Sequence, residues 1–301
     1  MDNNFHGVYA ALLTPFDEKE KVSERRLRGL VRFLISKGLH GLYICGSTGE
    51  GINMNVDERK LVAEIVKDEA RDKIKIICHI GGSNNTKNAV ELAKHAKKLK
   101  LDGLSSVPPF YYGYSFNDIF KYYNDVASCT DLPFIIYYIP GTTGVTISND
   151  KMMELAKIKN IIGLKFTGYD FYSMQELLMM TKGRWIAFSG PDEMSLPALT
   201  MGVVGSIGST QNNLPEIFLG IYNSFKSGNI QKAMQLQRRI TPAITFTRRF
   251  GSLVSRKVCL KFRGVDAGFC KRPLLQKMTK ENERKLKEIW KRHFPEYCEG
   301  I

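Results

Sequence analysis

The sequence predicts a (β/α)₈ barrel followed by a C-terminal helical extension. Short apolar runs alternate with longer amphipathic stretches, and this alternation occurs eight times at intervals of about 30 residues before only helical patterns remain. Continuous apolar strands are typical of a parallel sheet that is covered on both faces. Eight such units fit a closed barrel better than an open sheet, and no G-x-G-x-x-G or Walker motif favours a nucleotide-binding fold.

The predicted elements follow in chain order. The apolar runs predict strands at Val8–Leu13, Gly41–Cys45, Ile74–Ile80, Gly103–Val107, Phe134–Ile139, Ile161–Lys165, Trp185–Ser189 and Val203–Ile207. The helical patterns between them include Glu24–Ser36, Asp57–Glu69, Thr86–Leu99, Asn117–Ala127 and Asp150–Ile158. After Leu214 the pattern changes to helices at Glu216–Lys226, Ile230–Arg249 and Glu281–Arg292.

No low-complexity linker separates these two parts of the chain. We therefore expect residues 1–213 to form the barrel. Residues 214–301 are expected to supply its last helix and an extension that packs on it, within one folding unit.

The composition indicates a globular protein of the cytoplasm. Apolar residues make up 43% of the chain, but no run approaches the roughly 18 residues of a membrane span. Residues 1–8 lack the apolar segment of a signal peptide. The six cysteines are scattered without a C-x-x-C pair, which argues against a zinc ribbon and against a disulfide framework. The five histidines do not cluster at metal-ligand spacing, so no metal is expected.

The formal net charge of +14 is the most unusual global property of the chain. Such a charge attracts anions, either small carboxylates or nucleic acid. Basic residues gather toward the C-terminus at Arg238, Arg239, Arg248, Arg249, Arg256, Lys257, Lys261, Arg263, Lys271 and Arg272. We interpret them as solvated helix faces and subunit rims. Nucleic acid is not expected as a partner, because no basic motif with interleaved aromatic residues accompanies the charge.

Lys165 is the candidate nucleophile. It ends an apolar strand, and strand alternation places Gly163, Lys165 and Thr167 on one face and the bulky Leu164 and Phe166 on the other. The bulky face suits the helical layer, so the other face, with Gly163 below the lysine, is expected to point into the barrel. There the amine is desolvated, its pKa is lowered and it can attack a carbonyl. The alternative is a lysine at a strand end that extends to water.

Tyr137 lies on the preceding strand and shares a face with Ile135 and Ile139. An inward phenol at this place could serve as the acid and base that Schiff-base chemistry requires. The alternative is a core tyrosine hydrogen-bonded to backbone.

Two further strand ends carry polar residues. Gly46-Ser47-Thr48-Gly49 combines two hydroxyls with backbone amides that could hold a carboxylate. The pair Asp192-Glu193 follows Gly190 and could accept hydrogen bonds from substrate hydroxyls, although such a pair is also a common start of a helix.

Seven segments together resemble the dihydrodipicolinate synthase and N-acetylneuraminate lyase superfamily over about the whole chain. The segments are TPF at 14–16, GSTGEG at 46–51, PPFYYGYS at 108–115, YYIPGTTGV at 137–145, GLKFTGYDFY at 163–172, GPDE at 190–193 and GSIGST at 205–210. The resemblance implies a homotetrameric class I aldolase that acts on 2-oxo acids through a pyruvate enamine, without a metal or organic cofactor.

The resemblance also implies roles for individual residues. Lys165 would form the Schiff base, Tyr137 would shuttle protons, and Ser47 and Thr48 would bind the pyruvate carboxylate. Tyr111 would be the tyrosine that neighbouring subunits contribute to one another's sites. The residues implied to bind the hydroxyls of a sugar acid are Thr167, Gly190, Asp192, Glu193 and Ser209.

Within the superfamily, the sequence is more similar to the sialic acid lyase branch. Thr142 stands where the synthase branch carries an arginine, and the lyase-like segments include Phe110–Tyr112, Lys165–Thr167 and Gly268–Pro273. Tyr138 and Leu253 differ from that branch, which has an asparagine and an aromatic residue there.

This branch implies cleavage of N-acetylneuraminate to N-acetylmannosamine and pyruvate. The alternatives are a 2-keto-3-deoxy sugar acid aldolase, dihydrodipicolinate synthase, or a non-catalytic regulator that binds an anionic ligand.

Overall fold

The computed structural model describes residues 5–82 and 85–298, and within them the eight predicted strands form a closed parallel barrel. The strands are β1 (Gly7–Ala11), β2 (Gly41–Ile44), β3 (Lys75–His79), β4 (Gly103–Ser106), β5 (Phe134–Tyr138), β6 (Ile161–Phe166), β7 (Ile186–Ser189) and β8 (Gly205–Gly208). Each strand pairs with its neighbours in chain order, and β8 pairs with β1. The predicted fold class is confirmed. The sequence interpretation of residues 1–8 falls partly on residues 1–4, which lie outside the described residues.

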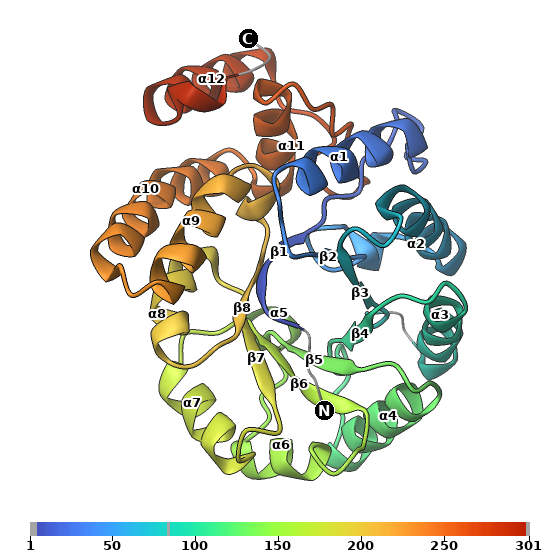
Figure 1. Ribbon diagram of the computed structural model, residues 1–301. Helices are drawn as coiled ribbons and strands as arrows, with labels where there is room; N and C mark the ends of the chain where they lie inside the picture. Colours follow the sequence, from blue (N-terminus) through green and yellow to red (C-terminus); the bar gives the residue numbers. More distant parts are fainter. Residues whose placement is uncertain (1–4, 83–84, 299–301) are drawn as a thin grey trace.

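Helices form the outer layer of the barrel (Figure 1). They are α1 (Glu24–Ser36), α2 (Val56–Ala70), α3 (Thr86–Lys98), α4 (Phe116–Ser128), α6 (Asn149–Leu155), α7 (Phe171–Met180), α8 (Ser195–Thr200) and α9 (Pro215–Lys226). In α1 the buried leucines and valine follow the helical period, and α2 and α4 begin with capping boxes at Asn55 and Ser115. The short helix α5 (Pro140–Thr143) follows β5 directly.

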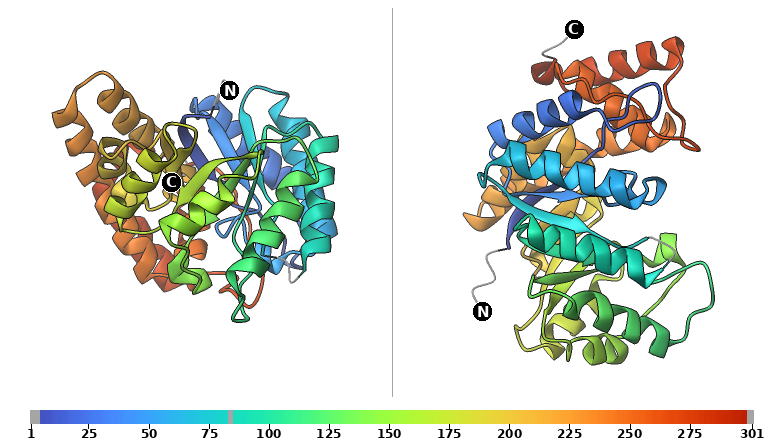
Figure 2. Two further views of the ribbon diagram at one scale, coloured as in Figure 1. Left: turned by 90° about the horizontal axis from the view of Figure 1, so that it is seen from below. Right: turned by 90° about the vertical axis from the view of Figure 1, so that its right-hand side faces the viewer.

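Three more helices follow the barrel: α10 (Ile230–Arg249), α11 (Ser252–Phe262) and α12 (Lys280–His293). Helix α11 packs against α10 and α12, and α11 and α12 lie on the same side of the molecule as α1 (Figures 1 and 2). Four short 3₁₀ turns, η1 (Gly51–Asn53), η2 (Asp192–Met194), η3 (Thr210–Asn212) and η4 (Pro295–Tyr297), complete the described elements. The segment after α11 returns to the barrel, where the backbones of Phe269 and Phe16 exchange hydrogen bonds.

The core has two parts that correspond to the two faces of the strands. A large cluster between strands and helices contains Leu164 and Phe166, and a smaller cluster inside the barrel contains Ile135 and Tyr137. Tyr137 therefore faces inward, which is the condition on which its role as acid and base depends. The bulky residues of β6 face the helices as predicted.

The prediction that Gly163 points into the barrel beneath Lys165 is wrong. The pairing of β5 with β6 shifts by one residue between Phe134 and Ile135, so Ile162 joins the interior cluster. A Cβ on Gly163 would lie 1.9 Å from the carbonyl oxygen of Ile186. Glycine at this position allows β6 and β7 to approach each other closely.

The interpretation of the C-terminal basic residues as solvated is wrong for three of them. Arg256, Lys257 and Arg263 lie on or directly after α11 and are at most 5% exposed. Their burial is possible because each cation finds acceptors: Lys257 pairs with Glu50, Arg263 pairs with Glu216, and Arg256 donates to the Ser252 carbonyl. Helix α11, which the sequence pattern did not predict, is therefore part of the core.

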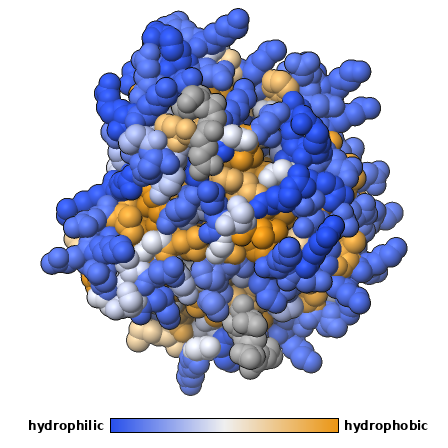
Figure 3. All heavy atoms as spheres, turned by 45° about the horizontal axis from the view of Figure 1, so that its top comes forward, coloured by the Kyte–Doolittle hydropathy of each residue, from blue (hydrophilic) through white to orange (hydrophobic). Residues whose placement is uncertain are grey.

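The remaining surface is mixed in character. On the face in Figure 3, polar side chains project around the edge and apolar side chains form a band across the middle. None of the described helices combines the length and apolar character needed to cross a bilayer.

Candidate active site

Lys165 and Tyr137 meet inside the barrel near the carboxyl ends of β5 and β6. The two residues are register partners, and Lys165 Nζ lies 3.9 Å from the centroid of the Tyr137 ring and 4.3 Å from that of Tyr43. Lys165 and Tyr137 are each only 4% exposed. The arrangement brings one amine and one phenol together at the end of a barrel where active sites form.

Burial lowers the pKa of the Lys165 ammonium, and the nearby Tyr137 and Asp192 partly oppose this effect. The dominant cause is desolvation, because a charged amine loses its hydration inside the barrel. The free amine is the nucleophilic form, so this position increases the reactivity of Lys165 toward a carbonyl carbon.

His79 completes an aromatic cluster around the amine. Its ring lies 5.7 Å from that of Tyr137 and 6.0 Å from that of Tyr43. Nδ1 lies 3.1 Å from the Cys45 carbonyl oxygen, and Nε2 accepts from the Val107 N–H at 3.3 Å. Both ring nitrogens are therefore used by backbone groups. Burial lowers the pKa of His79 well below its usual value, so the ring is neutral and supports the cluster.

The loop after β2 presents the hydroxyls of Ser47 and Thr48. Ser47 is exposed and Thr48 is half-buried, and neither hydroxyl has a hydrogen-bond partner among the described residues. The backbone folds back on itself, since Glu50 N donates to Ser47 O and Gly51 N donates to Gly46 O. The loop thus offers free donors suited to a carboxylate.

A buried ion pair fixes this loop from behind. Glu50 Oε1 lies 2.6 Å from Lys257 Nζ, and Glu50 Oε2 accepts from the Lys271 N–H at 2.7 Å. Lys257 also donates to the carbonyl oxygens of Thr14 and Phe269. The C-terminal extension therefore holds together the segment after β1, the Gly46–Gly51 loop and the segment around Phe269.

Asp192 begins η2 and turns toward the end of β8. Its Oδ2 accepts from Thr210 N at 2.8 Å and from the Ser209 hydroxyl at 3.2 Å. The side chain is buried and lies against Gly208, where an added Cβ would be 1.7 Å from Oδ1. Desolvation raises the pKa of Asp192, although the Thr210 hydrogen bond and Arg256 oppose this effect. Asp192 thus contacts the predicted Ser209 directly.

Glu193 belongs to a second cluster with Tyr169 and Arg248. Its Oε1 accepts from the Tyr169 hydroxyl at 2.7 Å and also pairs with the Arg248 guanidinium. Although partial burial favours the protonated acid, these hydrogen bonds and the cation lower the pKa of Glu193. The charge of Glu193 is therefore balanced by a basic residue from α10.

Thr167 and Gly190 touch each other at the ends of β6 and β7. Gly190 N donates to Phe166 O at 2.8 Å, and a Cβ on Gly190 would lie 1.8 Å from Thr167 Oγ1. Tyr138, which follows Tyr137, stacks on Phe166 with ring centroids 5.7 Å apart and so faces the helices.

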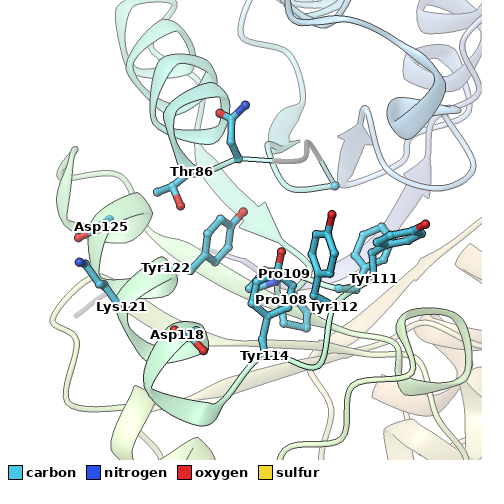
Figure 4. A pocket seen from close by; sticks show the side chains of 13 residues that line it. Thr86, Pro108, Pro109, Tyr111, Tyr112, Tyr114, Asp118, Lys121, Tyr122 and Asp125 are labelled. Carbon is cyan, nitrogen blue, oxygen red and sulfur yellow. The ribbon is translucent and has the colours of Figure 1, made fainter.

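Tyr111 lies in the loop between β4 and α4. Its side chain is 87% exposed, its φ of 89° is unusual for a residue with a Cβ, and its ring contacts that of Tyr112. The loop borders a cavity of about 610 Å³ that also includes Lys121 and Tyr122 of α4 (Figure 4). Neither Lys165 nor Tyr137 lines that cavity.

Four residues of these clusters were not predicted from the sequence as part of the site: Tyr43, His79, Tyr169 and Arg248. His79 ends β3, so the rule that active sites form at strand ends could have found it. Arg248 gives no such signal, because it lies 55 positions from Glu193 on a helix outside the barrel repeat.

Comparison with known proteins places the chain in a family. The model of the Dihydrodipicolinate synthetase family matches residues 4–293. The chain belongs to this family. The chain is 40% identical over 289 residues to the N-acetylneuraminate lyase of Clostridium perfringens strain SM101, covering 96% of this chain and 99% of that protein.

The fold is also similar to that of solved structures. CdNal from Clostridium difficile, solved in complex with mannosamine, superposes with a TM-score of 0.93 at 39% identity and covers 96% of this chain and 99% of its own. A catalytic lysine mutant of the Ruminococcus gnavus sialic acid aldolase has a TM-score of 0.91 at 27% identity and covers 99% of both chains.

Proposed function

We propose that this family member is an N-acetylneuraminate lyase that splits the open-chain sugar acid into N-acetylmannosamine and pyruvate. The observation that carries the proposal is the buried Lys165 amine. Its pKa is lowered, and its Nζ lies 3.9 Å from the centroid of the Tyr137 ring. The names of the similar proteins from Clostridium perfringens and Ruminococcus gnavus support the substrate class.

The reaction begins with attack of the Lys165 amine on the C2 ketone. The carbinolamine loses water and leaves an iminium ion, which withdraws electrons from the C3–C4 bond. Tyr137, which has given its own proton to the departing water, takes the proton of the C4 hydroxyl while that bond breaks, and this step releases the aldehyde and leaves an enamine. Protonation of the enamine at C3 and hydrolysis of the resulting iminium return the free amine and release pyruvate.

The other residues bind and orient the substrate. Ser47 and Thr48 hold the carboxylate next to C2, while Thr167, Gly190, Asp192, Glu193 and Ser209 form the region for the distal sugar part. No metal or organic cofactor is required, because the iminium ion supplies the electron sink. The proposal includes a cytoplasmic location, where the six free cysteines would stay reduced.

We further propose that the active enzyme is a homotetramer in which Tyr111 completes the site of a neighbouring subunit. The exposure and the unusual backbone of Tyr111 support a contact that a single chain does not provide.

A lactate-dehydrogenase-coupled assay of pyruvate release over a panel of 2-oxo sugar acids tests the activity. We expect N-acetylneuraminate to give the highest kcat/KM. Borohydride with pyruvate should trap an adduct on Lys165, and peptide mass analysis would locate it. A Lys165→Ala variant that still traps pyruvate would overturn the nucleophile, and preference for a 2-keto-3-deoxy acid would overturn the substrate.

A further inference from the structure

Two buried acceptors face the same point beside β8. Asp192 Oδ1 and Gln211 Oε1 are both buried, and neither has a hydrogen-bond partner among the described residues. A Cβ placed on Gly208 would lie 1.7 Å from the first oxygen and 2.4 Å from the second. Two unpaired acceptors this close are unfavourable, since each loses its hydration without gaining a donor.

The amide of Gln211 can remove this conflict without any other movement. In the structure its Nε2 lies 3.1 Å from the hydroxyl oxygen of Ser206. A half-turn of the amide about its last torsion places Nε2 toward Asp192 Oδ1 and lets Oε1 accept from the Ser206 hydroxyl. Both acceptors then have donors, and the chain of hydrogen bonds runs from Ser206 through Gln211 and Asp192 to Ser209.

The far end of this chain is the half-buried Ser209. Its hydroxyl donates to Asp192 Oδ2 at 3.2 Å, next to the Thr210 N–H at 2.8 Å. While Asp192 is ionised, the single hydroxyl hydrogen of Ser209 is committed to it, so Ser209 can only accept a hydrogen bond from a ligand. If Asp192 were protonated, Ser209 could instead donate.

We propose that Gln211 is a positioning residue that keeps Asp192 ionised and thereby makes Ser209 an acceptor for a substrate hydroxyl. The inference rests on the proposed function, because it assigns a specificity role to the sugar side of that site. With Ser209 as an acceptor, the site favours a polyhydroxylated substrate over one that presents only a hydrogen-bond acceptor to Ser209. Gln211 is fully buried and therefore acts through Asp192 and not by contact with substrate.

The charged groups around Asp192 are Arg256 of α11, the neighbouring Glu193 and, from β6, Lys165. Gln211→Met removes the amide but keeps the side-chain length. We expect it to raise the KM for N-acetylneuraminate about tenfold while kcat stays within about twofold. The increase in KM should be larger at lower pH. Without the amide donor, the buried Asp192 carboxylate takes up a proton at a higher pH than it does in the wild type.

Gln211→Glu gives the opposite trend and serves as the matched variant. The introduced carboxyl can share one proton with Asp192, so binding should approach that of the wild type at low pH and weaken as pH rises. Trapping of pyruvate alone by borohydride should be unchanged in both variants. An unchanged KM for Gln211→Met at every pH, or equal losses in pyruvate trapping, would overturn the positioning role.

A double-mutant cycle tests the same contact without any turnover. Gln211→Met and Asp192→Asn should each lower Tm, and their effects should not add if the two side chains are hydrogen-bonded. Additive effects would contradict the pairing. If the wild type cleaves no sialic acid but the cycle shows coupling, the proposed function fails and the hydrogen-bond chain stands.

Discussion

Lys165 lies inside the barrel with two phenol rings around its amine, and this environment changes its chemistry. A solvated lysine is almost fully protonated at neutral pH and is a poor nucleophile. Desolvation lowers the pKa of Lys165 because burial costs the ammonium more free energy than the amine. Thus the position of one side chain on β6, more than its residue type, makes the proposed reaction possible.

The pH dependence of Schiff-base formation follows from this shift. Because the pKa of Lys165 is lowered, its nucleophilic amine form should already predominate at pH values where a free lysine is still protonated. We expect the rate of borohydride trapping with pyruvate to rise with pH and to level off below the ordinary lysine pKa of about 10.4. A midpoint at or above that value would contradict the proposed environment of Lys165.

Glu193 should matter for the distal sugar part and not for pyruvate. Replacing Glu193 with Gln keeps the shape but removes a charged acceptor, which typically contributes about 1.5–3 kcal/mol or one to two decades in kcat/KM. We expect that loss on N-acetylneuraminate, with pyruvate trapping near wild type.

The control for Glu193 is Glu64→Gln, which removes the charge of a glutamate paired with His95 on the outer helices and should leave kcat/KM unchanged. If pyruvate trapping falls together with kcat/KM in Glu193→Gln, Glu193 supports the architecture of the site through Arg248 and Tyr169.

At the scale of elements, glycine allows two neighbouring strands to approach each other. Gly163→Ala would place a methyl group 1.9 Å from the Ile186 carbonyl oxygen, so β6 must move away from β7. We expect a loss of about 1–3 kcal/mol in the free energy of unfolding, measured in urea, and weaker trapping of pyruvate because Lys165 moves with β6.

Gly29→Ala is the matched substitution for Gly163→Ala. Gly29 lies within α1 and has no neighbouring atom within 4 Å of an added Cβ. Alanine should stabilise this helix by about 0.5–1 kcal/mol and leave activity unchanged. If Gly163→Ala also kept or increased stability and left activity unchanged, the site would not require the close approach of β6 and β7.

Helix α11 contributes the cation that holds the Gly46–Gly51 loop. Lys257→Met leaves the Glu50 carboxylate buried without its cation, since both side chains of the pair are at most 2% exposed. Removing one partner of such a pair typically costs about 3–5 kcal/mol of unfolding free energy. We also expect pyruvate to bind more weakly, because the loop that carries Ser47 and Thr48 loses its support.

Lys261→Met provides the control on the same helix. Lys261 is 46% exposed and lies 3.7 Å from Glu283, so its loss should change stability by no more than about 1 kcal/mol. The double variant Glu50→Leu/Lys257→Met should regain part of the stability lost in Lys257→Met. Equal effects of Lys257→Met and Lys261→Met would show that the buried pair does not support the loop.

The whole molecule is expected to act as an oligomer, and Tyr111 gives a direct test. If each site combines Lys165 of one subunit with Tyr111 of another, the Lys165→Ala and Tyr111→Ala variants should complement each other. Co-expression of the two impaired variants should restore about a quarter of wild-type kcat, because random assembly creates some complete sites. Sedimentation of the wild type should show four chains of 34.1 kDa each. No recovery in mixed assemblies, or a monomeric wild type, would contradict this arrangement.

The sequence alone was sufficient for the barrel and for which residues of β5 share a face. Apolar strands of period two and helices of period 3.6 depend on near neighbours, so they can be read along the chain. Short helices were missed, such as α5 and α8, because they contain too few turns to show a period. Strand alternation correctly predicted that Leu164 and Phe166 face the helices. It did not predict the register shift at Ile162 and Gly163, because that shift depends on how β6 pairs with β5 and β7.

Only the tertiary structure decided which charged residues are buried and what they contact. Lys257 and Glu50 are 207 positions apart, and Glu193 and Arg248 are 55 positions apart. A basic residue on a helix has the same local pattern whether it faces water or a distant carboxylate, so the sequence predicted solvated cations where Arg256, Lys257 and Arg263 are buried. The physical reason is that the cost of burying a charge depends on partners that meet only when the chain has folded.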